Sequence, residues 1–282
     1  MNKIWITGAG GLIGNYLAQT AHRFLPQATI LPLTRKDLDL TDFTAVRRAF
    51  QAQKPDLIIH CAALSQSPEC EANPALARRL NVQVTAELAQ LAAAIPFFFY
   101  STDLVFDGRQ GNYDEHASVN PLGVYAQTKV EAEKIVLSNP RHTVIRTSLN
   151  GGVSPTGDRG FNEKLRVAFQ AGKTLDLFTD EFRSPIPAEV TAEATWELVL
   201  QKKTGRYHVS GSERLSRFQM GQLVAARWPQ LNPNIVPGSL KNYAGAPRPP
   251  DTSLNCAKVQ QLLSFRLPRL SQWLDDHADI LF

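Results

Sequence analysis

Residues 3–14 read Lys-Ile-Trp-Ile-Thr-Gly-Ala-Gly-Gly-Leu-Ile-Gly. The run before the glycines predicts a short buried strand, and the residues from Leu12 to about Phe24 predict a helix. Glycines between a strand and a helix allow a tight turn and a close approach of the backbone to a ligand. The helix start then offers free N–H groups and the positive end of the helix dipole to a phosphate.

This turn departs from G-x-G-x-x-G, because Ile13 occupies the place of the third glycine. It fits T-G-x-x-G-x-x-G, with a glycine at each of the three required positions. A chance glycine turn is the alternative, but the strand before it and the helix after it favour dinucleotide binding. We therefore predict that the pyrophosphate of a dinucleotide binds at Gly8, Gly11, Leu12, Ile13 and Gly14.

Strands and helices alternate after this turn. Further strands are predicted at 28–33, 56–60, 96–101 and 142–147, and helices at 41–53, at 73–94 and from Asn120-Pro121 onward. The strands are apolar throughout, which is typical of a parallel sheet covered on both faces. The predicted fold class is α/β, a Rossmann-like doubly wound parallel sheet.

The pattern loosens after Thr147. A loop is predicted at 149–160, helices at 161–171, 187–201 and 267–277, strands at 174–178 and 205–209, and a long surface loop at 229–250. We expect residues 1–148, completed by 186–202, to form an NAD(P)-binding Rossmann domain. Residues 149–185 and 203–282 are expected to form a smaller C-terminal substrate-binding part over the crevice at the carboxyl ends of the strands.

Composition excludes several classes of protein. The net charge of +4 is small and scattered in pairs, so we do not predict nucleic-acid binding. The three cysteines are widely spaced and fit reduced cytosolic thiols, with no disulfide framework. No metal site, targeting peptide or membrane span is predicted, and we expect a cytoplasmic protein.

The end of the second strand indicates which dinucleotide binds. Dinucleotide folds that take NAD usually place an acid roughly 20 residues past the glycines, where it holds the ribose 2′-hydroxyl. Here Arg35 stands at that point, followed by Lys36. A cation there favours a 2′-phosphate, so NADP(H) is preferred, with NAD(H) as the alternative. The alternative is that Arg35 and Lys36 are an ordinary solvent-exposed pair that binds no cofactor. Asp39 and Leu40 are expected to border the adenine.

Small residues follow the third strand. Cys61, Ala62 and Ala63 would let a cofactor pass close to the backbone there, although ordinary packing explains them equally well.

Three side chains are candidates for the chemistry. Tyr125 and Lys129 lie one helical turn apart, so their phenol and ammonium project from one face. An ammonium beside a phenol is expected to lower the pKa of the phenol and suit it to proton transfer. Thr102 ends the Phe-rich strand and could donate a hydrogen bond to a substrate carbonyl.

The glycine turn, Ser101-Thr102-Asp103 and Tyr125…Lys129 resemble an extended short-chain dehydrogenase/reductase. The runs Ser101–Gly108, Asn120–Tyr125 and Arg146-Thr147-Ser148, with Asp39–Asp42 and Arg248-Pro249, are similar to the dTDP-4-dehydrorhamnose reductase family. This resemblance covers nearly the whole chain and is specific through Ser148.

The resemblance implies a function in dTDP-rhamnose biosynthesis or a related pathway. Tyr125 would protonate the keto oxygen of a nucleotide-linked 4-keto-6-deoxy sugar, Lys129 would hold the nicotinamide ribose, and Thr102 would orient the carbonyl. The substrate-binding residues would be Asp103, Ser148, Arg183 and Arg248. The partner is then a nucleotide sugar, with a homodimer as a further candidate.

Two departures concern the sugar. The family usually has an aromatic residue after Arg-Thr-Ser, whereas this chain has Leu149, and it often has Gly where this chain has Arg183. Arg183 would contact a phosphate or a different sugar, or would be a surface arginine.

Two other functions remain open. The same fold serves sugar-nucleotide dehydratases and epimerases, but dehydratases need Thr-Asp-Glu where this chain has Thr102-Asp103-Leu104. The regulatory subunit of methionine adenosyltransferase also resembles this family, so a non-catalytic, NADP-binding subunit is the alternative from another class. The intact Thr102, Tyr125 and Lys129 favour the enzyme.

Overall fold

A parallel sheet of six strands forms the centre of the protein in a computed structural model, which describes residues 2–280 and 282. In spatial order the strands are β10 (Gly205–Val209), β5 (Thr143–Thr147), β4 (Phe97–Thr102), β3 (Leu57–His60), β1 (Lys3–Thr7) and β2 (Thr29–Leu33). The chain reverses its direction across the sheet at β1, because β2 lies on one side of it and β3 on the other. This Rossmann-like order confirms the predicted fold class.

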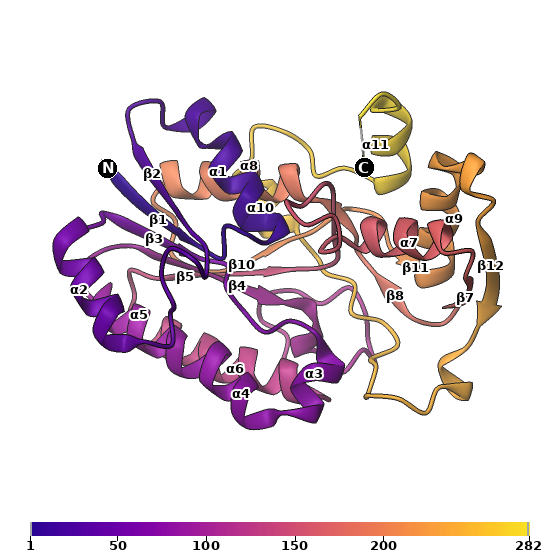
Figure 1. The fold of residues 1–282 in the computed structure, drawn as a ribbon, viewed down its shortest axis with the longest axis horizontal. Coiled ribbons are helices and arrows are strands. Elements are labelled where there is room, and N and C mark those ends of the chain that lie inside the picture. Colours follow the sequence, from indigo (N-terminus) through magenta and orange to yellow (C-terminus); the bar gives the residue numbers. More distant parts are fainter. Residues whose placement is uncertain (1, 281) are drawn as a thin grey trace.

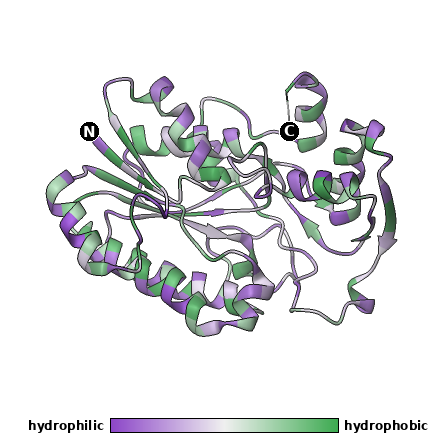
Figure 2. Ribbon diagram, in the orientation of Figure 1, coloured by the Kyte–Doolittle hydropathy of each residue, from purple (hydrophilic) through white to green (hydrophobic). Residues whose placement is uncertain are grey.

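Helices cover both faces of the sheet (Figure 1). One face packs against α1 (Leu12–Phe24), α8 (Ala188–Leu200) and α10 (Ala257–Gln260). The other packs against α2 (Phe43–Gln53), α5 (Val84–Leu91) and α6 (Val124–Leu137). In Figure 2 these helices are partly hydrophobic and partly hydrophilic, as amphipathic helices on a buried sheet should be.

A smaller part lies beyond the carboxyl ends of the strands (Figure 1). Its own core joins α7 (Phe161–Gln170), α9 (Arg217–Arg227) and α11 (Leu270–Asp276). Short strand pairs complete it: β7 (Thr174–Phe178) with β12 (Asn234–Gly238), β8 (Phe182–Arg183) with β11 (Leu215–Ser216), and β6 (Asn150–Gly151) with β9 (Ile186–Pro187).

Several boundaries differ from the prediction. Residues 205–209 were expected in the smaller part, but β10 pairs with β5 in the main sheet. The 229–250 segment contains a strand, β12, which its Pro, Gly and Asn content concealed. The helix expected over 73–94 is divided into α4 (Pro74–Arg78), a π-helical stretch (Arg79–Gln83) and α5, and α3 (Ser67–Ala72) precedes it.

The start of α6 was also predicted wrongly. Asn120-Pro121 does not begin the helix, which starts at Val124 with Gly123 as its N-cap. Glu71 Oε1, on α3, accepts a hydrogen bond from the Val124 N–H at 2.7 Å. A distant carboxylate thus supplies the cap that local sequence was expected to supply.

A buried ion pair fixes α6 against the sheet. Arg146, on β5, donates two hydrogen bonds to Glu133 on α6, from Nε at 2.9 Å and from Nη2 at 2.7 Å. The Arg146 side chain is 0% exposed and that of Glu133 is 3% exposed. The pair therefore holds the helix that carries Tyr125 and Lys129.

We predict that Arg146→Ala lowers the free energy of unfolding by about 3–5 kcal/mol, because the buried Glu133 carboxylate loses both hydrogen bonds and keeps only Arg206 Nε nearby among the described residues, at 3.7 Å. The matched control is Arg78→Ala, which breaks the largely exposed pair of Arg78 with Glu131 on the same helix α6. This control should cost less than about 1 kcal/mol. Urea unfolding followed by tryptophan fluorescence measures both, and equal losses would show that burial does not govern the effect.

Candidate active site

A cavity of about 1170 Å³ runs along the carboxyl edge of the sheet, between the glycine turn and the smaller part. The strand register brings the ends of β1, β4 and β5 to the same edge, with Thr102 level with Thr147. The sequence-predicted residues from the glycine turn, the second strand, the third strand and the Tyr125 helix all line this one cavity: Gly8, Gly11, Leu12, Ile13, Gly14, Arg35, Asp39, Leu40, Cys61, Ala62, Ala63, Thr102, Tyr125 and Lys129.

The glycine turn is closely packed around its backbone. Gly8 has φ +74°, and a Cβ added there would lie 2.6 Å from the Ala62 N. A Cβ at Gly14 would lie 2.5 Å from the Gly8 O, so only glycine lets α1 approach the turn. Gly11, the N-cap of α1, has no side chain to occupy the helix end. The free N–H groups there fit the phosphates of a dinucleotide.

Arg35 and Lys36 lie exposed at the rim beyond β2. The turn before them is closed by Asp37, which accepts hydrogen bonds from Thr34 N at 2.9 Å and Thr34 Oγ1 at 2.6 Å. Asp39 is bound within its own turn, where Thr41 N donates to it at 2.9 Å. These bonds, with the charge of Arg35 as a smaller cause, lower the pKa of Asp39. The Arg35 guanidinium makes no ion pair among the described residues.

The strand-three loop is tied to the Tyr125 helix by Asn81. Its side-chain Oδ1 accepts a hydrogen bond from Leu64 N at 2.8 Å, and its Nδ2 donates to Thr128 Oγ1 at 3.0 Å. Asn81 lies in the π-helical stretch, which is an irregularity often found at functional sites. Asn81 thereby fixes the loop after β3 relative to α6, which carries Tyr125 and Lys129.

Tyr125 is half-buried on α6 and lies near the Thr102 hydroxyl, which acts to lower the pKa of the phenol. Burial raises the pKa of Tyr125, and the charge of Asp103 raises it further. The expected lowering of the Tyr125 pKa by Lys129 is therefore wrong, because the pKa is raised. Desolvation of the phenolate is the larger effect here.

Lys129 is 2% exposed, with its Nζ 3.9 Å from the centre of the Phe99 ring. Burial lowers its pKa to about 7. It makes no ion pair or side-chain hydrogen bond among residues 2–280 and 282, so its ammonium is desolvated without a close anion. A buried lysine of this kind is typical of a functional site.

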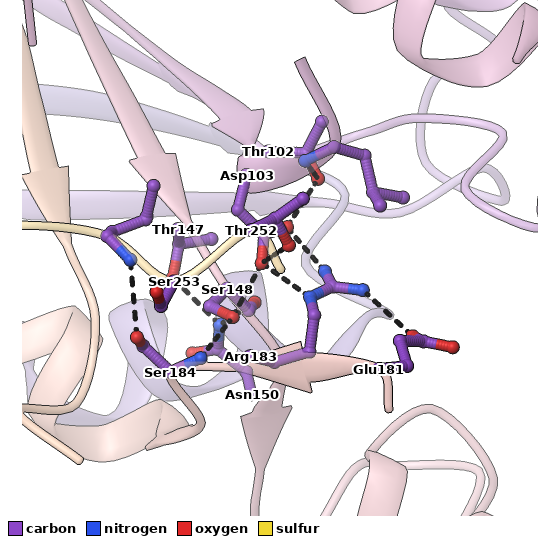
Figure 3. A network of polar contacts seen from close by, with 12 residues as sticks. Thr102, Asp103, Thr147, Ser148, Asn150, Glu181, Arg183, Ser184, Thr252 and Ser253 are labelled. Atoms are coloured by element: carbon purple, nitrogen blue, oxygen red, sulfur yellow. Dashed lines mark hydrogen bonds and ion pairs between the residues drawn. The ribbon is translucent and has the colours of Figure 1, made fainter. Parts of the chain in front are cut away.

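Of the four predicted substrate residues, Ser148, Arg183 and Arg248 line the cavity, and Asp103 follows Thr102 at the end of β4. Asp103 is 0% exposed and binds Arg183 and Ser148 directly (Figure 3). Arg248 donates to Glu181 at 2.7 Å instead. Asp103 is not among the residues that line the cavity, so its contacts are with protein groups.

Three cavity-lining cations were not predicted from the sequence: Arg159, Lys164 and Arg217. Arg217 begins α9, and its Nε lies 3.8 Å from Glu181 Oε1. A capping box of Ser216 with Gln219 marks this helix start and could have revealed it. Lys164 donates to Gln66 Oε1 at 3.4 Å, a contact between the two sides of the crevice.

The cavity concentrates positive charge. Among the residues that line it, eight are Lys or Arg and two are Asp or Glu. The whole chain has 30 of the former and 26 of the latter, so the remainder of the protein carries a slight negative excess. A cavity of this charge favours an occupant with several phosphates.

No group of His, Cys, Asp and Glu among the described residues could hold a metal ion. No helix in the described part of the chain is both long and apolar enough to cross a bilayer.

Comparison with known proteins identifies the family. The RmlD substrate binding domain family matches residues 1–281. A probable low-salt glycan biosynthesis reductase of Haloferax volcanii is 30% identical over 78% of both chains. Methionine adenosyltransferase 2 subunit beta of Bos taurus is 29% identical over 92% of this chain and 82% of its own.

Solved structures agree. A dTDP-4-dehydrorhamnose reductase of Yersinia enterocolitica has a TM-score of 0.84 at 26% identity, covering 99% of this chain and 98% of its own. A dTDP-4-dehydrorhamnose reductase of Bacillus anthracis in complex with NADP shares the fold, with a TM-score of 0.89 at 23% identity over 98% of both chains. The glycine turn, the Tyr125 helix and the whole-length match lead to one conclusion: this chain belongs to the RmlD substrate binding domain family, within the short-chain dehydrogenase/reductase fold.

Proposed function

We propose that this protein is an NADP(H)-dependent reductase of a nucleotide-linked 4-keto-6-deoxy sugar. The observation that carries the proposal is the convergence of Thr102, Tyr125 and Lys129 in one cavity with the glycine turn. Reductases among its relatives, and dTDP-4-dehydrorhamnose reductases among similar structures, support the reaction class.

In this proposal Tyr125 gives its phenolic proton to the keto oxygen, and Thr102 orients the carbonyl by a hydrogen bond. The bound cofactor supplies the hydride that adds to the carbonyl carbon. The Lys129 ammonium lies one turn from Tyr125, where it would bind the nicotinamide ribose. Glycines that exclude any Cβ, and an uncapped helix start, fit the pyrophosphate of that cofactor.

The basic wall of the smaller part suits the other ligand. Arg217 and Arg248 approach the single carboxylate of Glu181, which is 1% exposed. Their joint charge exceeds that of Glu181, so an anion can still be attracted there. We infer that this wall accepts the diphosphate of the nucleotide sugar, and that Leu149 leaves more room for the sugar than an aromatic residue would.

A second candidate is a non-catalytic, NADP-binding regulatory subunit. The similarity to methionine adenosyltransferase 2 subunit beta, over 92% of this chain, favours it. Stoichiometric co-purification with an enzyme, together with absence of turnover on any sugar nucleotide, would support this candidate and overturn the reductase.

Tyr125→Phe should lower kcat by about 10²–10⁴ fold, because it removes the proton donor. The affinity for NADPH should stay within about twofold. NADPH oxidation with a panel of nucleotide-linked 4-keto sugars measures the first quantity, and quenching of NADPH fluorescence measures the second. Tyr207→Phe, outside the cavity, is the control; full turnover in Tyr125→Phe would refute the assignment of the acid.

Arg35→Ala should weaken NADPH binding by about tenfold or more, because a charge-assisted hydrogen bond to the 2′-phosphate is worth about 1.5–3 kcal/mol. NADH binding should change by less than about twofold. Direct titration of both cofactors measures this, with the exposed Arg109→Ala as the control for loss of a surface charge. Equal weakening of the two cofactors would contradict the preference for NADP(H).

Lys129→Met should stabilise the unliganded protein in a pH-dependent way. The pKa of Lys129 is lowered to about 7 from the ordinary 10.5, so between these values the unfolded chain holds a proton that the folded protein lacks. Wild-type stability should therefore rise with pH across this window, by up to about 1.4 kcal/mol per unit.

The variant should lack that rise and exceed wild type by on the order of 2–4 kcal/mol at pH 7, with the gain fading towards pH 10. Urea unfolding at a series of pH values measures it, with Lys134→Met as the control at an exposed site on the same helix. A gain in stability that does not depend on pH would show that burial does not lower the pKa of Lys129 in the folded protein.

A further inference from the structure

Asp103 accepts hydrogen bonds from four other residues, three of them on separate segments of the chain (Figure 3). Arg183 Nε donates to Asp103 Oδ2 at 2.6 Å, and Arg183 Nη2 donates to Oδ1. Ser148 Oγ donates to Oδ2 at 2.7 Å and Thr252 Oγ1 donates at 3.2 Å. Thr102 Oγ1 donates to Oδ1, also at 3.2 Å. Arg183 is the one cation that binds this carboxylate directly among the described residues.

Arg183 directs two of its three guanidinium nitrogens, Nε and Nη2, to Asp103. It is 6% exposed, and its two bonds to Asp103 use the fork of the guanidinium. Its Nη1 lies 3.7 Å from Glu181, which already accepts a 2.7 Å hydrogen bond from Arg248. Arg183 lines the cavity, so the expectation from the sequence that it contacts a phosphate or a sugar stays a prediction.

The carboxylate competes with the substrate for the Thr102 hydroxyl. The hydroxyl must donate to the ketone oxygen in the proposed reaction, yet here it donates to Asp103. That bond is long, at 3.2 Å, whereas the bonds from Arg183 Nε and Ser148 are 2.6 and 2.7 Å. Because Arg183 and Ser148 already satisfy the carboxylate with short hydrogen bonds, the bond from Thr102 is weak. The Thr102 hydroxyl can therefore turn towards a ligand at little cost in free energy.

Asp103 also acts on Tyr125 through its charge. The charged and titratable groups around the phenol are Asp103, Arg183, Cys70 on α3, and Lys129 on the same helix. Among them Asp103 raises the pKa of Tyr125 and Arg183 lowers it. Arg183 therefore opposes Asp103 at the phenol, although Asp103 has the larger effect of the two.

We propose that Arg183 is a positioning residue, which neutralises Asp103 so that the hydroxyls of Thr102 and Tyr125 remain available to a bound ketone. The inference rests on the proposed role of Tyr125 as the proton donor. It assigns to the Asp103–Arg183 pair no contact with the substrate; the pair acts through its neighbours.

The decisive experiment needs no substrate. A fluorinated tyrosine, whose phenol is more acidic, replaces Tyr125 in the full-length protein, and its ¹⁹F chemical shift is followed against pH. Arg183→Gln should raise the pKa of this phenol by about one unit or more, and Asp103→Asn should lower it. The double variant Asp103→Asn/Arg183→Gln should return it to the wild-type value or below, because Asp103 has the larger effect of the two.

Arg214→Gln is the matched control. Arg214 directly precedes Leu215, the residue that pairs with Arg183 between β11 and β8. Arg214 forms an ion pair with Asp251 at 2.7 Å. It does not line the cavity, so the titration should not move. If Arg183→Gln fails to fold because Asp103 is left unpaired, two other variants still test the proposal. Arg183→Lys should titrate near wild type, and the double variant should titrate at the wild-type value or below it. An unchanged titration in Asp103→Asn would overturn it.

Kinetics separate this role from substrate binding. With a turned-over keto sugar, Arg183→Gln should lower kcat about tenfold or more with little change in KM, and the added Asp103→Asn should restore most of the loss. A raised KM without rescue would show instead that Arg183 binds the substrate, and would refute the proposal. Because the ¹⁹F titration is independent of turnover, an inactive protein with the expected titrations would refute the reductase but not the charge relation.

Discussion

The buried carboxylate of Asp103 needs hydrogen-bond donors and a positive charge close to it. The residues that supply them define how the two parts of this protein meet. Asp103 follows Thr102 at the end of β4, and its partners come from the ends of β5 and β8 and from the segment around Thr252. Removal of a charge from water costs several kcal/mol unless nearby donors replace the solvent. The smaller part supplies most of those donors, so its position over the crevice and the environment of Tyr125 are set by the same contacts.

Charge also explains what the cavity can hold. Its cations come from both parts of the chain, and the glycine turn adds N–H groups without a side chain. Lys129 and Tyr125 lie between these two basic regions, in surroundings that disfavour the charged form of each. Phosphate groups entering the cavity would favour the charged form of Lys129, so the site suits a ligand that carries phosphates.

Much of the fold could be predicted from local patterns. The strands of the main sheet are continuous apolar runs, and α1, α7 and α8 begin and end within about one residue of their predicted limits. Prediction failed where distant residues decide the outcome. Glu71 caps α6 in place of Asn120, and β12 exists because it pairs with β7, despite its Pro and Gly content. Residues 205–209 join the main sheet because β5 offers them an edge.

The candidate site divides in the same way. Three features of the candidate site are local patterns: the glycine spacing, a cation after the second strand, and the Tyr125…Lys129 pair. Each can be recognised in the sequence, because it depends only on the spacing of residues along a turn, a strand or a helix. The pairing of Asp103 with Arg183, the convergence of Arg217 and Arg248 on Glu181, and the raised rather than lowered pKa of Tyr125 depend on burial and on partners far away in the chain. Solvation and charge act through space, and only the tertiary structure decides which groups lose water and which charges become neighbours.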